Sequence, residues 1–108
     1  MEQKHLEMVS TLNAKLGANG QLLNLNKECA EMQVIVSDML RGFDVPRSVF
    51  VGGLADLYVM LNAAVLLYHV TPAEINALID GKLSRSLEFL SGPVPASETD
   101  PSGVVLDN

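Results

Sequence analysis

The residues of this chain that could do chemistry are carboxylates. Several are spaced along residues 24–38, and a further aspartate lies later in the sequence, in an apolar stretch. Glu28 and Glu31 are three positions apart, which places two side chains on one face of a helix. Asp56 is the later carboxylate. Mg²⁺ prefers hard oxygen ligands, usually one or two carboxylates together with waters and substrate phosphates. We therefore predict that Glu28, Glu31 and Asp56 bind Mg²⁺, or Mn²⁺ in its place, for catalysis on a phosphate-bearing ligand.

Two basic residues further along the chain could balance the charge of such a ligand. Lys82 and Arg85 continue an apolar row of the last predicted helix, so we expect them at the margin of its buried face. The competing interpretation is that both side chains only extend to solvent from the edge of the core. The glutamate pair has a similar alternative as the solvated edge of a helix. For Asp56 the alternative is a structural pair with Arg47 or a helix cap.

The sequence gives little support for a catalytic site built on a cysteine or serine nucleophile. Cys29 is the only cysteine, so no internal disulfide is possible. It lies in the middle of an apolar stripe, and we expect it in the core rather than acting as a nucleophile. The two histidines, His5 and His69, stand in positions that do not favour a nucleophile–histidine arrangement.

Helical periodicity predicts how these residues are positioned. We expect an all-α bundle of about four helices within one domain, residues 1–91, followed by a disordered acidic tail, residues 92–108. Gly17 is a plausible stop for the first helix, and Asn19-Gly20 marks a turn. The expected helices cover residues 4–16, 21–41, 47–69 and 71–91. An apolar stripe should bury the second of them: Leu22, Leu25, Cys29, Met32, Val36 and Met39.

The third expected helix is apolar on almost every side, which a small bundle can hardly enclose. We therefore predict self-association into a homodimer or homotetramer with this helix in the interface. Gly52-Gly53 within it indicates either a break or a close approach by another element. The fourth helix should begin with a capping box, formed by Thr71 and Glu74.

Charge and hydropathy restrict the partners. The net charge of −6 argues against nucleic acid and against an anionic membrane surface. The N-terminus lacks the apolar run of a signal peptide. The longest apolar run, residues 57–67, is shorter than the roughly 20 residues that span a bilayer. We expect a soluble, cytoplasmic protein.

Three segments resemble the MazG-like family of all-α nucleoside triphosphate pyrophosphohydrolases over roughly residues 4–90. They are residues 26–31 (NKECAE), 54–57 (LADL) and 81–85 (GKLSR). The resemblance implies that an E-x-x-E pair and an E-x-x-D pair hold Mg²⁺, and that the enzyme releases pyrophosphate from a nucleoside triphosphate. By position, Glu28 and Glu31 match the first pair, Asp56 matches the aspartate of the second, and Lys82 and Arg85 match a basic phosphate contact.

The chain departs from the family at two positions. Gly53 stands where the second pair has its glutamate, and Lys27 stands where many members have a further glutamate. These changes should weaken cation binding, although Lys27 could bind an anionic ligand directly; Asp38 is a distant substitute for the missing carboxylate. Three hypotheses remain: a Mg²⁺-dependent nucleotide pyrophosphohydrolase of reduced activity, a non-catalytic nucleotide-binding or regulatory relative, and a structural helical oligomer.

Overall fold

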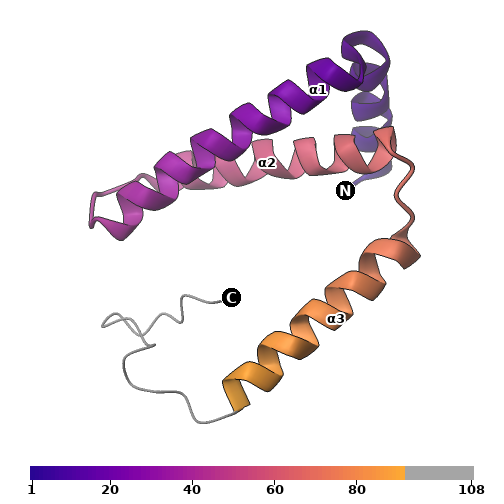
Figure 1. Cartoon of the computed structure of the whole chain (residues 1–108). Coiled ribbons are helices and arrows are strands. Elements are labelled where there is room, and N and C mark those ends of the chain that lie inside the picture. Colours follow the sequence, from indigo (N-terminus) through magenta and orange to yellow (C-terminus); the bar gives the residue numbers. More distant parts are fainter. Residues whose placement is uncertain (92–108) are drawn as a thin grey trace. The chain divides into compact units, whose positions relative to one another are not determined.

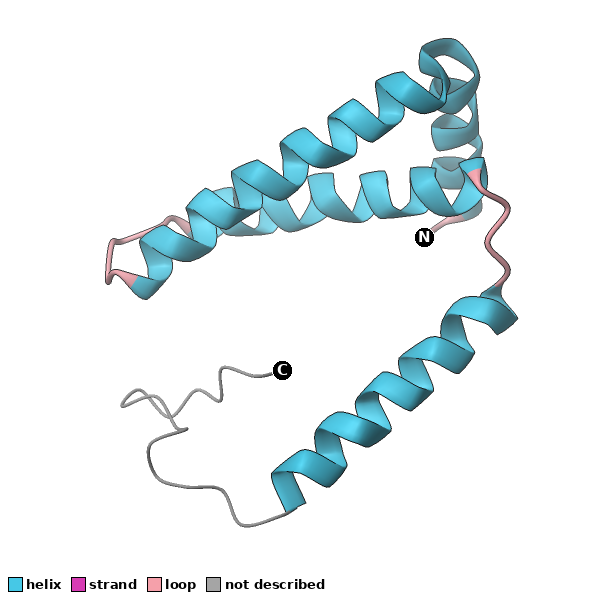
Figure 2. Cartoon of the chain, in the orientation of Figure 1, coloured by secondary structure: helices cyan, strands magenta, loops and turns pink. Residues whose placement is uncertain are grey.

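The computed structural model describes residues 1–91, and these residues are helical apart from short connections (Figures 1 and 2). The helices are α1 (Gln3–Leu40), α2 (Arg47–Leu67) and α3 (Pro72–Ser91). The prediction of an all-α chain is confirmed. The chain divides into two compact units after Val70, so α1 and α2 form the first unit and α3 belongs to the second. The predicted tail, residues 92–108, lies outside the described residues.

α1 contains the break that the sequence predicted, although the break is narrower than expected. Gly17 has φ 73° and ψ 172°, outside the helical region, and the chain turns sharply there (Figure 1). A positive φ of this size suits glycine because it has no Cβ. Asn19 and Gly20, predicted as a turn, are helical instead. The two first helices of the prediction are therefore one kinked element, and the four-helix count is not confirmed.

Three polar side chains hold the kink against α2. Asn13 Nδ2 donates to the carbonyl of Ala63 at 3.2 Å, and Gln21 Nε2 donates to Asn13 Oδ1 at 2.9 Å. Asn24 Nδ2 then donates to Gln21 Oε1 at 3.1 Å. Gln21 is buried, so these bonds remove the cost of placing an amide away from water. The network joins the two halves of α1 to the C-terminal part of α2.

The face of α1 that meets α2 differs from the predicted one. The half-buried residues between positions 22 and 40 share one strip of α1: Asn24, Leu25, Glu28, Met32, Ile35 and Asp38. Leu22, Val36 and Met39 of the predicted stripe are instead about 40% exposed or more. The expectation that this stripe forms the core is therefore wrong for these three residues within the first unit. Leu25 and Met32 of the same stripe are half-buried, and Leu25 packs against the core. Its buried apolar core consists of Val9, Met60 and Ala63, with Leu25, Val59 and Leu66 packed against it.

Gly53 allows the close approach of α2 to α1. A Cβ added to Gly53 would lie 2.9 Å from Ile35 Cδ1 and 3.2 Å from Met32 Sδ, whereas one added to Gly52 would meet nothing within 4 Å. α2 runs through both glycines without interruption. Of the two explanations predicted for the glycine pair, close approach holds at Gly53 and a helix break does not.

α2 is apolar but largely uncovered within its own unit. Leu54, Tyr58 and Leu61 are exposed, while Met60 and Ala63 are buried. By length and composition this helix could cross a membrane: its mean hydropathy reaches 1.8 over an 18-residue window, of which 11% is buried. Core helices of soluble proteins and signal sequences also meet this test, so the finding assigns no location.

The capping box predicted at the start of α3 is confirmed. The backbone N–H and the hydroxyl of Thr71 donate to Glu74 Oε2 at 2.8 Å and 3.0 Å, and the Glu74 N–H donates to Thr71 Oγ1 at 3.2 Å. The backbone bond and then the hydroxyl bond hold the pKa of Glu74 below its ordinary value. The apolar stripe of α3, which includes Leu83 and Leu87, is exposed.

Candidate functional site

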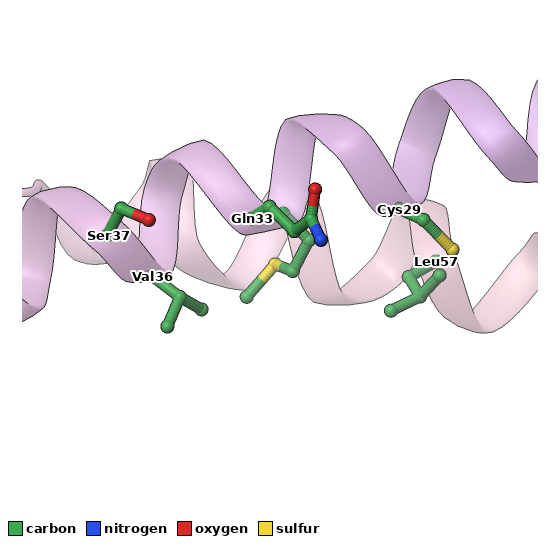
Figure 3. Close-up of a pocket in the computed structure, with 6 residues that line it drawn as sticks. Cys29, Gln33, Val36, Ser37 and Leu57 are labelled. Atoms are coloured by element: carbon green, nitrogen blue, oxygen red, sulfur yellow. The ribbon is translucent and has the colours of Figure 1, made fainter.

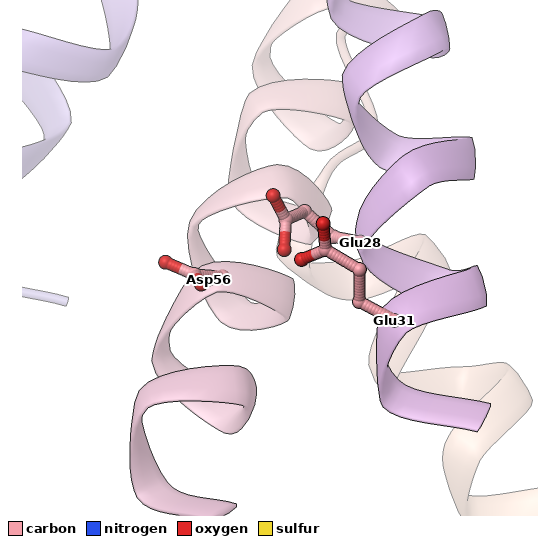
Figure 4. A group of neighbouring side chains, drawn as sticks. All are labelled: Glu28, Glu31 and Asp56. Carbon is pink, nitrogen blue, oxygen red and sulfur yellow. The ribbon is translucent and has the colours of Figure 1, made fainter. Parts of the chain in front are cut away.

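The three carboxylates predicted as a metal site come together between α1 and α2. One oxygen from each of Glu28, Glu31 and Asp56 lies within 4.8 Å of the others, and no second group of this kind occurs among residues 1–91. Glu28 and Glu31 extend from one face of α1, three positions apart, towards α2, which carries Asp56 (Figure 4). The i, i+3 spacing of the glutamates and the close packing at Gly53 bring the two helices to this geometry.

Glu28 is the carboxylate most affected by its surroundings. Its side chain is 15% exposed, the least of the three, because it lies on the strip that faces α2. The pKa of Glu28 is raised, first by desolvation, then by a hydrogen bond with Glu31 and by the charges of Glu31 and Asp56. The charge of Lys27 partly opposes this rise. Crowded carboxylates with a raised pKa are stabilised by a proton or by a cation.

The positively charged ammonium group of Lys27 lies beside two of the three carboxylates. Lys27 Nζ lies 3.9 Å from Glu28 Oε1 and 3.9 Å from Glu31 Oε1. The lysine is 65% exposed, so these pairs contribute little to stability. They do place a positive charge at the edge of the acidic group. Lys27 was predicted to bind substrate, and its position beside the acids is compatible with contact to an anion held there.

Asp56 is more exposed than the sequence suggested. Its apolar neighbours in the sequence predicted a costly, desolvated carboxylate, but the side chain is open to solvent. That expectation is wrong because α2 is not enclosed within the first unit. The alternative of a structural pair with Arg47 is absent from the ion pairs of the described residues. Asp56 is therefore free to contribute an oxygen to a ligand.

The remaining predicted residues do not join the acidic group within the first unit. Asp38 lies on α1 outside the group. Lys82 and Arg85 lie on α3, in the second unit, and both are exposed. Their predicted contact with phosphate stays a prediction. No described residue adds a fourth carboxylate to the group. At Gly53, where the family pattern has its glutamate, Ile35 Cδ1 would lie 2.9 Å from an added Cβ.

Cys29 was predicted to be a core residue, and this prediction is wrong for the first unit. Its thiol is exposed and lies beside a pocket of about 490 Å³. Figure 3 shows Cys29, Gln33, Val36, Ser37 and Leu57 around this pocket. The pocket follows the predicted apolar stripe of α1, which α2 leaves uncovered. Nothing near the thiol suggests a nucleophile, since no histidine lines the pocket.

No family model, curated protein or solved structure matches the chain. The resemblance to the MazG-like family therefore rests on the residues quoted from the sequence. What the structure adds is the proximity of three of those residues.

Proposed function

We propose that the protein is a Mg²⁺-dependent nucleoside triphosphate pyrophosphohydrolase of reduced activity, related to the MazG-like family. The observation that carries this proposal is the approach of the Glu28, Glu31 and Asp56 oxygens to within 4.8 Å of one another. Asp56 lies 25 positions after Glu31 and on a different helix, so the fold rather than local sequence brings Asp56 to the glutamates. The exposure of Glu31 and Asp56 leaves room for waters and phosphate oxygens.

The donor set fits Mg²⁺ or Mn²⁺. Three carboxylates supply hard oxygens, and the remaining positions of an octahedron are normally filled by water and phosphate. When bound, such a cation polarises a phosphoryl oxygen and lowers the pKa of an attacking water. Glu28 and Glu31 would hold the cation from α1, while Asp56 would do so from α2. Lys27 would orient the substrate through a phosphate oxygen, and Lys82 with Arg85 would supply further positive charge.

Reduced activity follows from two features of the site. Gly53 removes one carboxylate of the family pattern, and the Ile35 and Met32 side chains lie where a side chain at this position would begin. Lys27 places an ammonium 3.9 Å from two of the three carboxylates. Both features lower the negative charge available to a divalent cation. We expect weaker metal binding than a four-carboxylate site would give.

The second candidate is a non-catalytic nucleotide-binding or regulatory protein, and the position of Lys27 favours it. An ammonium beside carboxylates can contact a phosphate without a metal. In this case the nucleotide would bind through Lys27, Lys82 and Arg85. The third candidate, a structural helical oligomer, is favoured by the exposed apolar side chains of α2.

Turnover separates these candidates. The full chain is incubated with a panel of ribo- and deoxyribonucleoside triphosphates and Mg²⁺ or Mn²⁺, and pyrophosphate release is measured. We expect slow release that falls to background in Glu28→Gln and in Asp56→Asn. Asp38→Asn, which removes a carboxylate from α1 outside the group, should keep the wild-type rate.

Other outcomes decide against catalysis. If no nucleotide is hydrolysed but one raises the melting temperature, the nucleotide-binding candidate replaces the enzyme. If no nucleotide is hydrolysed or raises the melting temperature, only the structural candidate remains. Release that persists unchanged in both Glu28→Gln and Asp56→Asn would show that the reaction does not use this site.

A further inference from the structure

The Lys27 side chain lies beside the acidic group without being fixed to it. Its Nζ is 3.9 Å from one oxygen of Glu28 and 3.9 Å from one oxygen of Glu31. A charged hydrogen bond between nitrogen and oxygen is about 2.7–2.9 Å long, so these contacts are attractions between charges without a direct hydrogen bond. Lys27 also precedes Glu31 by four positions, which is the weaker order for an ion pair along a helix. The ammonium can therefore leave the carboxylates at little cost.

The ammonium of Lys27 is paired with α1 alone. The ion pairs of the described residues join it to Glu28 and Glu31, whereas none of them includes Asp56 of α2. The lysine side chain is 65% exposed, and its ammonium has three N–H donors on a flexible stem. It can therefore turn from the carboxylates to the adjacent solvent without any movement of α1 or α2.

The charges at the site show what a mobile ammonium can do there. Three ionised carboxylates carry three negative charges on oxygens within 4.8 Å of one another. A divalent cation neutralises two of these charges, which leaves one negative charge next to any phosphate that arrives. This remaining charge repels the phosphate. The Lys27 ammonium neutralises it when the ammonium turns from the carboxylates to the phosphate.

We infer that Lys27 couples the binding of a divalent cation to the binding of phosphate. In the metal-free protein its ammonium is the counter-ion of Glu28 and Glu31. When a divalent cation takes that place, the ammonium is released and donates to a phosphate oxygen of the ligand. The site therefore binds a cation and a phosphate group together better than it binds either alone. This inference rests on the proposed function and adds a role for Lys27 in both binding steps.

An ordinary surface ion pair is the competing interpretation of the same contacts. An exposed lysine beside two glutamates contributes little to stability and has no necessary effect on a ligand. The two interpretations differ in the factor by which phosphate raises the affinity for the cation. By thermodynamic linkage, the cation raises the affinity for phosphate by the same factor, so this one number measures the coupling. The inference requires that the factor falls when Lys27 is replaced.

Mn²⁺ titrations of the full chain test the inference, with inorganic phosphate as the probe for the anion. Electron paramagnetic resonance reports free Mn²⁺ with and without phosphate, and a protein-free titration accounts for manganese phosphate in solution. Lys27→Gln should bind Mn²⁺ alone about fivefold more tightly than the wild type, because the competing ammonium is removed. Phosphate should raise the Mn²⁺ affinity of the wild type about fivefold more than that of Lys27→Gln, because the variant cannot donate a charged hydrogen bond to the phosphate.

Two further variants separate the position of the lysine from its charge. Lys15→Gln removes the same charge from another exposed position of α1, and Lys15 takes part in none of the described ion pairs. It should match the wild type in both titrations. Lys27→Arg keeps a positive charge on a long side chain, so it should keep the coupling. Lys27 is exposed, and circular dichroism should show that its variants retain the helical fold.

The outcomes distinguish failure of the inference from failure of the proposed function. If phosphate raises the Mn²⁺ affinity of the wild type and of Lys27→Gln by the same factor, the inference is overturned and the metal site remains. The same holds if Lys27→Gln binds Mn²⁺ no more tightly than Lys15→Gln does. If the wild type binds no Mn²⁺ with or without phosphate, the proposed function fails and the inference fails with it.

Discussion

Glu28 is the residue on which the proposed metal site most depends, because it faces α2 and is the least exposed of the three carboxylates. Its pKa is raised by desolvation and by its acidic neighbours. A raised folded-state pKa means that the folded protein binds the proton more tightly than the unfolded chain does. This contribution to stability is fully present below the ordinary pKa of 4.5 and is lost as the pH rises through the folded-state value. At neutral pH the ionised Glu28 therefore opposes folding.

This linkage gives a prediction for Glu28→Gln. The variant should have a higher melting temperature than the wild type at neutral pH without divalent cations, because the amide is neutral. The difference should shrink as the pH falls through the raised pKa of Glu28 and be smallest below 4.5, the ordinary value. Thermal melts followed by circular dichroism across this pH range provide the measurement, with Glu88→Gln on α3 as the control. A neutral-pH loss of stability in Glu28→Gln would contradict the assignment.

At the level of elements, the α1–α2 contact depends on the missing side chain at Gly53. Replacing a helical glycine by alanine normally stabilises a protein by about 0.5–1 kcal/mol. Gly52→Ala should show this gain because nothing lies within 4 Å of its added Cβ. Gly53→Ala should gain less or lose stability, because Ile35 and Met32 must shift. Urea unfolding of the two variants measures the difference, and equal gains would show that the close approach at Gly53 is unimportant.

Local signals predicted the break at Gly17 and the start of α3, whereas the choice of packing face was not predictable in the same way. The Thr71–Glu74 capping box and the break at Gly17 depend on neighbouring residues, so the sequence alone locates them. The hydrophobicity of Leu22 and Val36 shows that they need an apolar cover, but it does not say which surface provides it. The fold pairs α2 with the strip containing Glu28 and Ile35 instead, and leaves Leu22 and Val36 exposed within the first unit.

In the candidate site too, spacing along one helix was predictable from the sequence, whereas contacts between helices were not. The i, i+3 spacing predicted that Glu28 and Glu31 share a face, and Asp56 was predicted as a third ligand from a later apolar helix. The structure brings the three together. The sequence could not decide between a helix break and close packing at Gly53, because the packing depends on the Ile35 side chain of another helix. The exposure of Asp56 was also missed, since an apolar sequence context does not show whether the chain encloses it.

At the scale of the molecule, α2 of the first unit carries two different surfaces. One side brings Asp56 to the α1 glutamates, and the other carries the exposed apolar side chains of Leu54, Tyr58 and Leu61. The net charge of −6 favours cations as ligands, and nucleotides would then bind through the cation or through local lysines. Variants of Leu61 can therefore test the predicted self-association while leaving the acidic group intact.

The most direct test of the central claim is a titration of the protein with Mn²⁺, followed by the electron paramagnetic resonance signal of the free ion. The account predicts binding of about one Mn²⁺ per chain, competed by Mg²⁺, and lost in Glu28→Gln and in Asp56→Asn but kept in Asp38→Asn. Lys27→Gln should bind Mn²⁺ more tightly than the wild type, because it removes the competing ammonium. Wild-type protein that leaves all the Mn²⁺ free, or variants that bind as well as the wild type, would contradict the account.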